Sequence, residues 1–547
     1  MSLVVPFDEI FAQEIGLLAK HHTWERVEIK LVAEIINGFP FKSSLFSKDK
    51  GFPIIRIRDI SCSKSETYYI GEYVEEYVVL SGDLLIGMDG NFICCEWKGE
   101  RGLLNQRVCK VITNEKYLVK KFLLYGINGY LSAIQKATSS VTVAHLSSLD
   151  IVKIPFPLPP LKEQQRIVAK LEKLLAKVDT CKERLGKIPA ILKHFRQSIL
   201  AAACSGRLTA DWREGNPDVE SAEELLKNIR YERRNVWEEN QLSRIKLKKK
   251  QPKVDNWKQN YQEPAFPKIE EIFFEIPESW CYSFIEILLS TTRKGMKTGP
   301  FGSLLKKHEH QTEGVPVLGI ENIAAMEFIP GSKIHISKEK ANELSEYDAR
   351  PGDVLISRSG TVGEVCVVPE GLGEARISTN LMRISLAPNG LVPAFFCMLF
   401  NGSPFVLNQI SELCKGSTRD FLNQEILSSI IFPIPPLSEQ QEIVNRVQTL
   451  FKIADQIEQR YQKAKSYVDG LSQSIIAKAF RGELVPQDPN DEQASVLLER
   501  IKAEWAKQEG KTRVVKKSKS TGKITGSTKS KVKKQNLKII QPKLPGF

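Results

Sequence analysis

The chain lacks the features that would place it in a membrane, a secretory pathway or a disulfide-rich class. No apolar run approaches the ~18–20 residues that a membrane-spanning helix needs, and the first residues, MSLVVPFDEIFAQEIG, carry acids but no basic segment, unlike a signal peptide. The 10 cysteines are scattered, with neither a C-x-x-C motif nor a Cys/His group at zinc spacing. We therefore expect a cytoplasmic protein with reduced thiols, no bound metal and no membrane partner.

Catalytic motifs are equally scarce. Both Pro-Pro dipeptides lie in L/I-P-P-L contexts, so the N/D-P-P-F/Y methyltransferase signature is missing, and no G-x-x-x-x-G-K-[ST] phosphate loop occurs. The 7 histidines show no H-x-E or H-E-x-x-H spacing. Asp89, Glu96 and Lys98 form a D-x₆-E-x-K pattern resembling that of Mg²⁺ nucleases, but such patterns recur by chance in charged sequence. We favour a solvated hairpin rim and expect no catalytic residues.

The body of the chain also has little net charge. Residues 511–547 contain 12 Lys and Arg and no acid, whereas the rest has 66 basic and 65 acidic residues, a net of +1 out of the total of +13. The 511–547 segment is rich in Ser, Thr, Gly and Lys, and we expect a disordered basic tail. Such a tail either adds sequence-independent attraction to phosphates or is simply solvated.

What the sequence does have is one stretch that it uses twice. LPPLKEQQRIV lies in residues 154–187 and IPPLSEQQEIV in residues 430–463, and the correspondence continues to QSILAAACSGRL (197–208) and QSIIAKAFRGEL (473–484). A repeat of this length indicates an internal duplication, which must be recognised before the fold is assigned.

Each copy opens with prolines, which suit the approach to a helix, and continues with apolar residues at alternating steps of three and four. This heptad pattern predicts two long helices that pair as a coiled coil, each roughly 60 Å long at ~1.5 Å per residue. The predicted seam consists of Leu171, Leu174, Val178, Leu185, Ile188, Leu192, Phe195, Val447, Leu450, Ile457, Tyr461, Val468, Leu471 and Ile475.

Two points remain open for these helices. Each seam could instead pack onto its own globule, although two seams of matching period are more simply satisfied by each other. Pro189 lies inside the first pattern and is expected to kink or interrupt that helix near Leu185.

The segments ahead of each arm read as mixed strand and helix, and they also repeat. GFPIIRIRDI (51–60) parallels GVPVLGIENI (314–323), SGDLLIGMDG (81–90) parallels PGDVLISRSG (351–360), and LNQRVCKV (104–111) corresponds loosely to TNLMRISL (379–386). The framework strands match while the intervening loops differ, and loops on a rigid scaffold are where recognition usually resides.

We therefore predict an α+β fold with a pseudo-two-fold repeat: two mixed α/β globules joined by a long antiparallel two-helix coiled coil. The expected parts are a first recognition globule with a short N-terminal helix, a first arm with its short helix, a linker, a second globule, a second arm and the basic tail. Their predicted bounds are 1–153, 154–239, 240–276, 277–429, 430–510 and 511–547. Two readers at a fixed spacing would match two half-sites on duplex DNA.

The duplicated LPPLKEQQRIV and IPPLSEQQEIV segments, the SGRLTADWRE segment and the GDVLISRSG strand resemble the specificity subunits of type I restriction-modification enzymes. The resemblance covers roughly residues 20–505 and excludes the basic tail. It implies that each globule reads one half of an asymmetric bipartite target in double-stranded DNA, and that the arms set the spacing. It also implies a non-catalytic subunit that recruits two adenine-methylating modification subunits and restriction (motor-nuclease) subunits, which would hold S-adenosylmethionine, ATP and Mg²⁺.

Base reading needs side chains that donate or accept at base edges, such as Arg and Lys to guanine or Asn and Gln to adenine. The candidates in turns of globule one are Lys42, Ser43, Ser44, Arg56, Arg58, Asn91, Asn105, Gln106 and Arg107. Those in globule two are Lys297, Thr298, Ser303, Lys306, Lys307, Arg358, Thr361, Asn380 and Arg383. Any single one could be an ordinary surface group or cap; as a set they gather at matching framework positions.

Two other functions fit parts of the sequence. A stand-alone DNA-binding regulator would also carry two readers, and a coiled-coil scaffold would join proteins without touching DNA. The nearly neutral body argues against tight DNA binding by this chain alone, because phosphate contacts supply much of the non-specific affinity.

Overall fold

The computed structural model describes residues 6–11, 16–137, 145–247, 255–268, 274–301, 304–358, 363–414, 422–518 and 539–540. The chain divides into two compact units. Unit 1 consists of Met1–Leu185 with Lys463–Phe547, and unit 2 of Gly186–Gln462. Each unit thus combines one globule with parts of both long helices. None of the helices in the described residues is long and apolar enough to cross a membrane.

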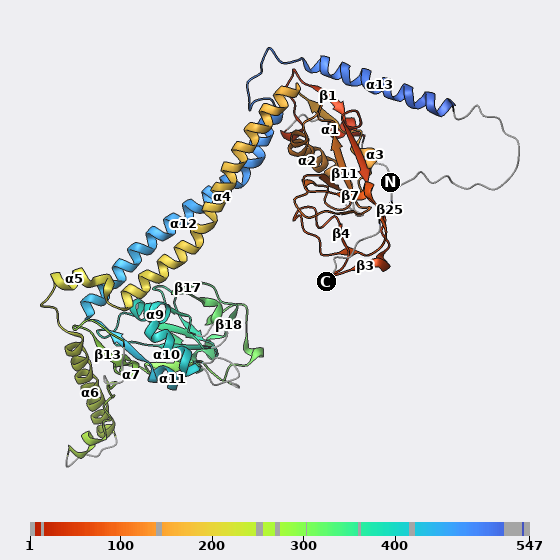
Figure 1. The fold of residues 1–547 in the computed structure, drawn as a ribbon. Helices are drawn as coiled ribbons and strands as arrows, with labels where there is room; N and C mark the ends of the chain where they lie inside the picture. The colour runs from red at the N-terminus through yellow and green to blue at the C-terminus, as the bar shows by residue number, and fades with distance from the viewer. Residues whose placement is uncertain are drawn as a thin grey trace, which may run out of the picture. The chain divides into compact units, whose positions relative to one another are not determined.

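In the described residues, unit 1 contains two larger β-sheets and two strand pairs (Figure 1). The first sheet has the order β3 (Phe46–Ser47), β5 (Tyr68–Tyr69), β4 (Phe52–Ile55), β10 (Gly102–Leu104) and β7 (Val78–Val79). The second has the order β2 (Ala33–Asn37), β11 (Val108–Thr113), β8 (Leu84–Gly87) and β9 (Cys94–Glu96). One pair is β1 (Glu25–Glu28) with β12 (Pro155–Leu158), and the other is β6 (Tyr73–Val74) with β25 (Ile539–Ile540).

The helices of unit 1 cover these strands. The short ones are α1 (Phe7–Phe11), α3 (Ser148–Ile151) and the 3₁₀ turns η1 (Gly16–Leu18), η2 (Ile29–Leu31), η3 (Ser43–Leu45) and η4 (Glu75–Tyr77). The main helix is α2 (Lys120–Ala137), whose buried residues recur at steps of three and four, as on the inner face of an amphipathic helix. Phe122 of α2 stacks on Phe480 at 4.8 Å between ring centroids and meets Phe156 edge-on, which joins α2, β12 and a long helix in one core.

Unit 2 repeats this plan. One sheet has the order β14 (Met296–Thr298), β23 (Leu381–Ile384), β20 (Val354–Ser357) and β21 (Val365–Val367). Another has the order β18 (Ile334–Ile336), β15 (Val315–Leu318), β22 (Ala375–Ile377) and β19 (Asp348–Ala349). The strand pairs are β13 (Cys281–Phe284) with β24 (Ile431–Ile434), and β16 (Ile323–Ala324) with β17 (Glu327–Phe328).

The shorter helices of unit 2 are α5 (Ala210–Gly215), α6 (Ala222–Leu247), α7 (Ile285–Leu288), α8 (Lys338–Glu343), α9 (Pro393–Gly402), α10 (Pro404–Cys414) and α11 (Gln424–Ser429). Its 3₁₀ turns are η5 (Arg207–Thr209), η6 (Asp255–Asn260), η9 (Lys307–Glu309), η10 (Ile320–Asn322) and η11 (Ser345–Tyr347). The helix α9 is apolar nearly all round and lies in the core of the unit, because its residues Phe395 to Phe400 are all buried.

The strand pairing confirms the duplication. The order β2-β11-β8-β9 of unit 1 matches β14-β23-β20-β21 of unit 2. In the other large sheet of each unit, two strands pair in parallel: β4 with β10 in unit 1, and β15 with β22 in unit 2. It also corrects the loose match of 104–111 with 379–386. Lys110 lies opposite Leu85 and Arg383 opposite Leu355, so Arg383 is equivalent to Lys110, not to Val108. A shift of two residues keeps every side chain on the same sheet face, so the apolar pattern alone could not reveal it.

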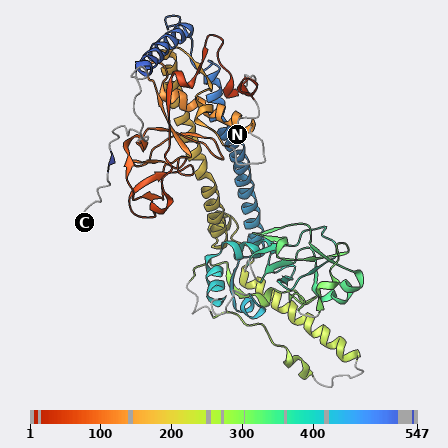
Figure 2. The same ribbon diagram turned by 90° about the vertical axis from the view of Figure 1, so that its right-hand side faces the viewer.

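The two long helices are α4 (Leu161–Cys204) and α12 (Leu437–Phe480), each 44 residues, yellow and light blue in Figure 1. The first part of α4 shares unit 1 with the last part of α12, whereas unit 2 holds the opposite parts, so the helices run antiparallel. In unit 2, Arg196 of α4 pairs with Asp455 (2.7 Å) and Glu458 (3.3 Å) of α12 and lies over the ring of Phe451. Figure 2 shows the two long helices from another side.

The predicted seam is buried at some positions and partly exposed at others. Leu171, Val178, Leu192, Val447 and Tyr461 are buried. In contrast, Phe195, Ile457 and Leu471 remain exposed, and the rest of the predicted seam is intermediate: Leu174, Leu185, Ile188, Leu450, Val468 and Ile475. The ends of both helices also join the cores of the globules. The two packing modes considered for the seam therefore both contribute.

Pro189 does not interrupt α4, so the predicted interruption near Leu185 is wrong, whereas the alternative, a kink there, stays a prediction. The helix is continuous from Leu161 to Cys204 with the proline inside it. Proline removes one hydrogen bond to the carbonyl four residues earlier. Around Leu185 the helix surface is largely exposed, so water can satisfy that carbonyl, and the long helix on either side keeps the turn in place. Gly206 and Gly482, with φ of 74° and 73°, follow the two helices in the left-handed conformation that ends a helix.

Two segments are more ordered than predicted. The helix α6 extends to Leu247 into the predicted linker, and residues 255–268 fold back on it: Trp257 stacks on Trp237 at 5.9 Å, and Glu263 pairs with Arg230 at 2.7 Å. In the predicted tail, α13 (Ala494–Ser518) reaches past residue 511, and β25 (Ile539–Ile540) pairs with β6 (Tyr73–Val74). In the linker, the aromatic side chain of Trp257 found a partner in α6 that composition cannot indicate.

Candidate nucleic-acid interface

In unit 1, most of the predicted DNA-reading residues come together in one hollow. Strands β4 and β10 are parallel, with Ile55 opposite Leu104, so their carboxyl ends meet at one edge of the sheet. The residues that follow each strand therefore become neighbours. They line a hollow of about 330 Å³ together with a turn at η3; the lining residues are Phe41, Ser43, Phe46, Arg56, Ile57, Arg58, Asn105, Gln106 and Arg107.

A close backbone contact fixes the floor of this hollow. The Asn105 amide donates to the Ile55 carbonyl at 3.3 Å, and the Gln106 amide donates to the Phe39 carbonyl at 3.1 Å. A Cβ added to Gly38 would lie 1.9 Å from the Asn105 carbonyl oxygen, so only glycine fits there. Unit 2 repeats the contact, because a Cβ on Gly299 would lie 1.9 Å from the Ser378 carbonyl oxygen. The two turns are thus built alike.

Arg107 is held by a carboxylate. Its Nη1 donates to Asp89, whose other oxygen contacts Nδ1 of His145 at 2.5 Å. The Asp89 side chain is 12% exposed and that of Arg107 is 62% exposed. The guanidinium therefore projects into solvent from an anchored end, whereas a free arginine would sample many rotamers.

Arg56 and Arg58 occupy a tight turn after β4. The Asp59 carboxylate accepts from the Arg56 amide at 2.9 Å and lies 3.7 Å from Nε of Arg58. Burial raises the pKa of Asp59 above its ordinary value, while the Arg56 hydrogen bond and the two arginines act in the opposite direction. The turn holds one arginine half-buried and the other exposed beside the hollow.

Three candidates of unit 1 lie outside the hollow. Lys42 and Ser44 flank Ser43 on the exposed side of η3, and Asn91 is exposed in the turn between β8 and β9. The nuclease-like pattern of Asp89, Glu96 and Lys98 begins next to this turn. Asp89 is engaged by Arg107 and His145, and the Lys98 amide donates to Ser63. Within the part of the chain that the structure describes, no group of three or more metal-ligating side chains occurs.

The candidates of unit 2 are placed less uniformly. Lys297 pairs with Glu346 and lies 4.5 Å from the ring centre of Tyr347, and Thr298 accepts from Gln424 at 3.3 Å. Lys306, Lys307 and Asn380 are exposed. Ser303 and Thr361 lie outside the described residues.

Arg358 and Arg383 are buried, with 3% and 1% of their surfaces exposed, and among the candidates in the described residues Asn105 (7%) is buried as well. Arg358 donates to the carbonyls of Leu422 and Thr379, each at 3.2 Å. Burial lowers the pKa of both guanidinium groups. Neither can reach a base without leaving these contacts, so their burial argues against the predicted base-reading role and favours a structural one.

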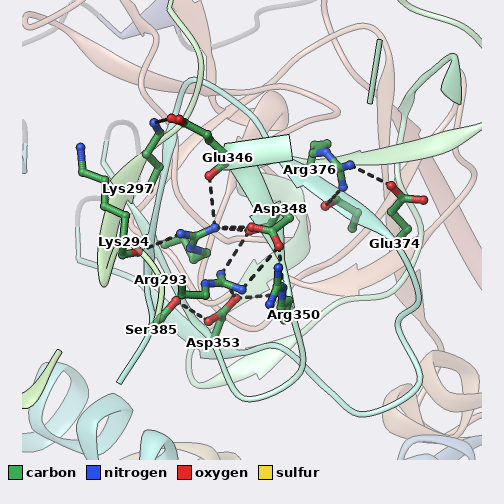
Figure 3. Close-up of polar contacts among 12 residues, drawn as sticks. Arg293, Lys294, Lys297, Glu346, Asp348, Arg350, Asp353, Glu374, Arg376 and Ser385 are labelled. Atoms are coloured by element: carbon green, nitrogen blue, oxygen red, sulfur yellow. Dashed lines mark hydrogen bonds and ion pairs between the residues drawn. The ribbon is translucent and has the colours of Figure 1, made fainter. Parts of the chain in front are cut away.

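Arg383 belongs to a charged network inside unit 2. Its Nη1 donates to Asp348 Oδ1 at 2.6 Å, and Nη2 donates to the carbonyl of Lys294 at 3.0 Å. Figure 3 shows the surrounding carboxylates of Asp348 and Asp353 among Arg293 and Arg350. Lys110, the equivalent residue of unit 1, donates to the carbonyl of Val78 at 2.8 Å. In both units, the side chain at this position links two β-sheets by hydrogen bonds.

Two pairs of residues make the same polar contacts in both units, and the sequence analysis did not predict a role for them. In unit 1, Glu163 accepts from Trp24 Nε1 at 3.2 Å, and in unit 2, Glu439 accepts from Trp280 Nε1 at 2.9 Å. The next residues, Gln164 and Gln440, each donate to two carbonyls and accept one amide in equivalent places. The duplicated Glu-Gln-Gln motif was the signal that could have identified them. They fasten each globule to its helix.

Comparisons with known proteins all indicate the same family. A family model described as type I restriction modification DNA specificity domain matches residues 21–190 and 302–465. The specificity subunit of the type I restriction enzyme EcoBI from Escherichia coli is 36% identical over 521 residues, covering 93% of this chain and 98% of that subunit. The EcoKI specificity subunit of Escherichia coli K12 is 27% identical over 525 residues, covering 90% and 98%. One chain from a solved type I R-M system shares the fold, with a TM-score of 0.54 at 18% identity, covering 85% of this chain and 99% of that one.

Proposed function

This chain belongs to the type I restriction-modification DNA specificity family, and on that premise we propose that it is the DNA-recognition subunit of such a complex. The observation that carries the proposal is the duplicated recognition framework. Each unit forms the same glycine contact beneath a loop cluster, whereas the side chains above it differ. A scaffold that is kept while its loops change is what a reader of two different half-sites requires.

We propose that each globule reads one half of an asymmetric bipartite target in double-stranded DNA. The antiparallel helices would fix the number of unspecified base pairs between the halves. They would also dock two modification subunits, and restriction subunits would join this core. Methyl transfer and cleavage, with S-adenosylmethionine, ATP and Mg²⁺, belong to those partners, and the complex would act in the cytoplasm.

The alternatives make different demands on the chain. A stand-alone regulator must bind its site tightly by itself, but the chain without residues 511–547 carries a net charge of only +1. A protein scaffold has no use for a hollow lined by three arginines. The restriction-modification role fits both facts, because partner subunits supply the remaining phosphate contacts.

Co-expression with the modification subunit of the same host tests the proposal. Sequencing that detects methyladenine is expected to show methylation at one bipartite motif, absent when this chain is omitted. Methylation without a motif, or the same motif without this chain, would refute the role.

The helices provide a second test. Within unit 2, the contact of Arg196 with Asp455 sets the register of the two antiparallel helices. Deleting 183–189 and 463–469 removes one heptad from each helix and keeps the seam in phase. The shortening of ~10 Å corresponds to about three base pairs at ~3.4 Å each. An unchanged spacer in the methylated motif would show that the helices do not set it.

A further inference from the structure

The turn at residues 56–59 of unit 1 and its equivalent at residues 319–322 of unit 2 share a backbone hydrogen bond but carry side chains of opposite charge. In unit 1 the Arg56 amide donates to Asp59 at 2.9 Å, and in unit 2 the Gly319 amide donates to Asn322 at 2.8 Å. Within this matched turn, Arg56 is replaced by Gly319 and Arg58 by Glu321. Two donors of unit 1 are thus exchanged for one acceptor in unit 2.

The glycine and the glutamate of unit 2 depend on each other. A Cβ built on Gly319 would lie 2.2 Å from Oε2 of Glu321. The carboxylate therefore lies against the position where unit 1 carries the Arg56 side chain. Glu321 itself is exposed. A larger residue at 319 would push this acceptor away, so the pair sets the polarity of the surface.

In unit 1, Asp89 holds one end of the guanidinium of Arg107, which lines the hollow. Its Nη1 donates to Asp89, so the Nε and Nη2 donors, which share the other edge of the guanidinium, are not used by this carboxylate. Guanine offers two acceptors, O6 and N7, on its major-groove edge, and a paired set of guanidinium donors matches them. Cytosine offers a single amino donor there, which suits a carboxylate.

Resting on the proposed function, we propose that the unit 1 hollow reads a guanine through Arg107, with Asp89 as its positioning residue, and that Glu321 of unit 2 reads a cytosine in the other half-site. The two units would then differ in charge at the matched turn, where Glu321 replaces Arg58, while Arg107 reads its base from the neighbouring turn of unit 1. Asp89 acts through Arg107 and does not itself touch the base, because a carboxylate directly beside guanine O6 and N7 would repel them.

The test uses the complete complex with its modification subunit and a duplex library randomised over the bipartite target. Arg107→Gln is expected to lower the preference for guanine at one position about tenfold or more. Glu321→Gln is expected to lower the preference for cytosine at one position of the other half. Arg101→Gln and Glu327→Gln are matched controls on the surfaces of the same units, and both are expected to leave the selected sequence unchanged.

Asp89→Asn keeps the size of the side chain but removes its charge. A positioning role predicts a several-fold loss at the same base position that Arg107→Gln affects, with other positions unchanged. A purely structural role predicts an equal loss for every sequence, and thermal melting of each variant identifies that case.

The outcomes separate the inference from the function. If the unmodified complex selects no bipartite sequence, the proposed function fails. If it selects one, but Arg107→Gln and Glu321→Gln leave every base preference intact or affect the same half-site, the inference is overturned. A uniform loss with Asp89→Asn overturns the positioning role alone.

Discussion

The buried glutamate at the start of α12 gives a sharp test of how a globule is fastened to its helix. Glu439 is fully buried and accepts from Trp280 Nε1 at 2.9 Å, Thr209 Oγ1 at 2.7 Å and Nη1 of Arg213. Glu439→Gln keeps the shape but replaces one acceptor oxygen with a donating amide. The variant therefore leaves Arg213 without its counter-charge and one neutral donor without its acceptor.

The magnitude follows from burial. Removing one partner of a buried ion pair costs about 3–5 kcal/mol because the other charge stays behind. The Arg213 side chain is 22% exposed and can be partly rehydrated, so we expect about 3 kcal/mol, the lower end of that range. Glu442→Gln on the same helix is the control. Glu442 pairs with Arg446 four residues later at 2.6 Å and is partly exposed, so its loss should cost only about 0.3–0.5 kcal/mol.

Hydrogen–deuterium exchange by segment measures this cost, because protection reports the free energy of local opening. A loss of about 3 kcal/mol corresponds to roughly 100-fold faster exchange in β13 and the first turns of α12. Glu163→Gln in unit 1 offers a matched comparison. Glu163 accepts from Trp24 and from the amide of Gln487, both neutral, so the substitution should cost only about 1 kcal/mol.

The reasoning is wrong if Glu439→Gln accelerates exchange no more than Glu442→Gln does. Equal effects of Glu439→Gln and Glu163→Gln would show a smaller error: the hydrogen bonds would matter, but the charge of Arg213 would not.

Three further predictions follow from the same geometry. Burial raises the pKa of Glu163, so the folded state keeps a proton that the unfolded state has released; the opening free energy of unit 1 should fall as pH rises between the unfolded and folded pKa values, and Glu163→Gln should flatten that dependence in urea titrations. Arg358→Ala should lower the stability of unit 2 by about 2–3 kcal/mol and weaken all DNA sequences alike, since the buried arginine donates to carbonyls; relaxation at a single base position would instead restore its base-reading role. Gly38→Ala should cost about 3 kcal/mol or more and abolish sequence-selective binding, because its Cβ would lie 1.9 Å from a carbonyl oxygen; wild-type melting and selectivity would contradict the close contact.

Some elements could be read from the chain because their signals are local and repeated. The duplicated Pro-Pro openings and heptads predicted two long helices, and α4 and α12 begin directly after those prolines. The alternating apolar runs predicted the framework strands, among them β8 and β11. The two similar halves supported each other, so a chance pattern in one could be discounted.

Local patterns failed where the outcome depended on distant partners. Arg358, Arg383 and Arg107 were all predicted to read bases from their place near framework strands. Arg358 and Arg383 are buried, however, whereas Arg107 is exposed beside a hollow. Likewise, the sequence analysis assigned Asp89 to a solvated hairpin rim, and it could not indicate that Arg107 and His145 contact this carboxylate.

By itself, the sequence determined the duplicated plan, the two long helices and the positions of the turns, because periodicity, prolines and glycines act within a few residues of themselves. Only the tertiary structure decided which polar residues share a hollow and which are buried. That choice depends on the parallel pairing of β4 with β10, which joins segments almost fifty residues apart, and no pattern within either segment records its partner.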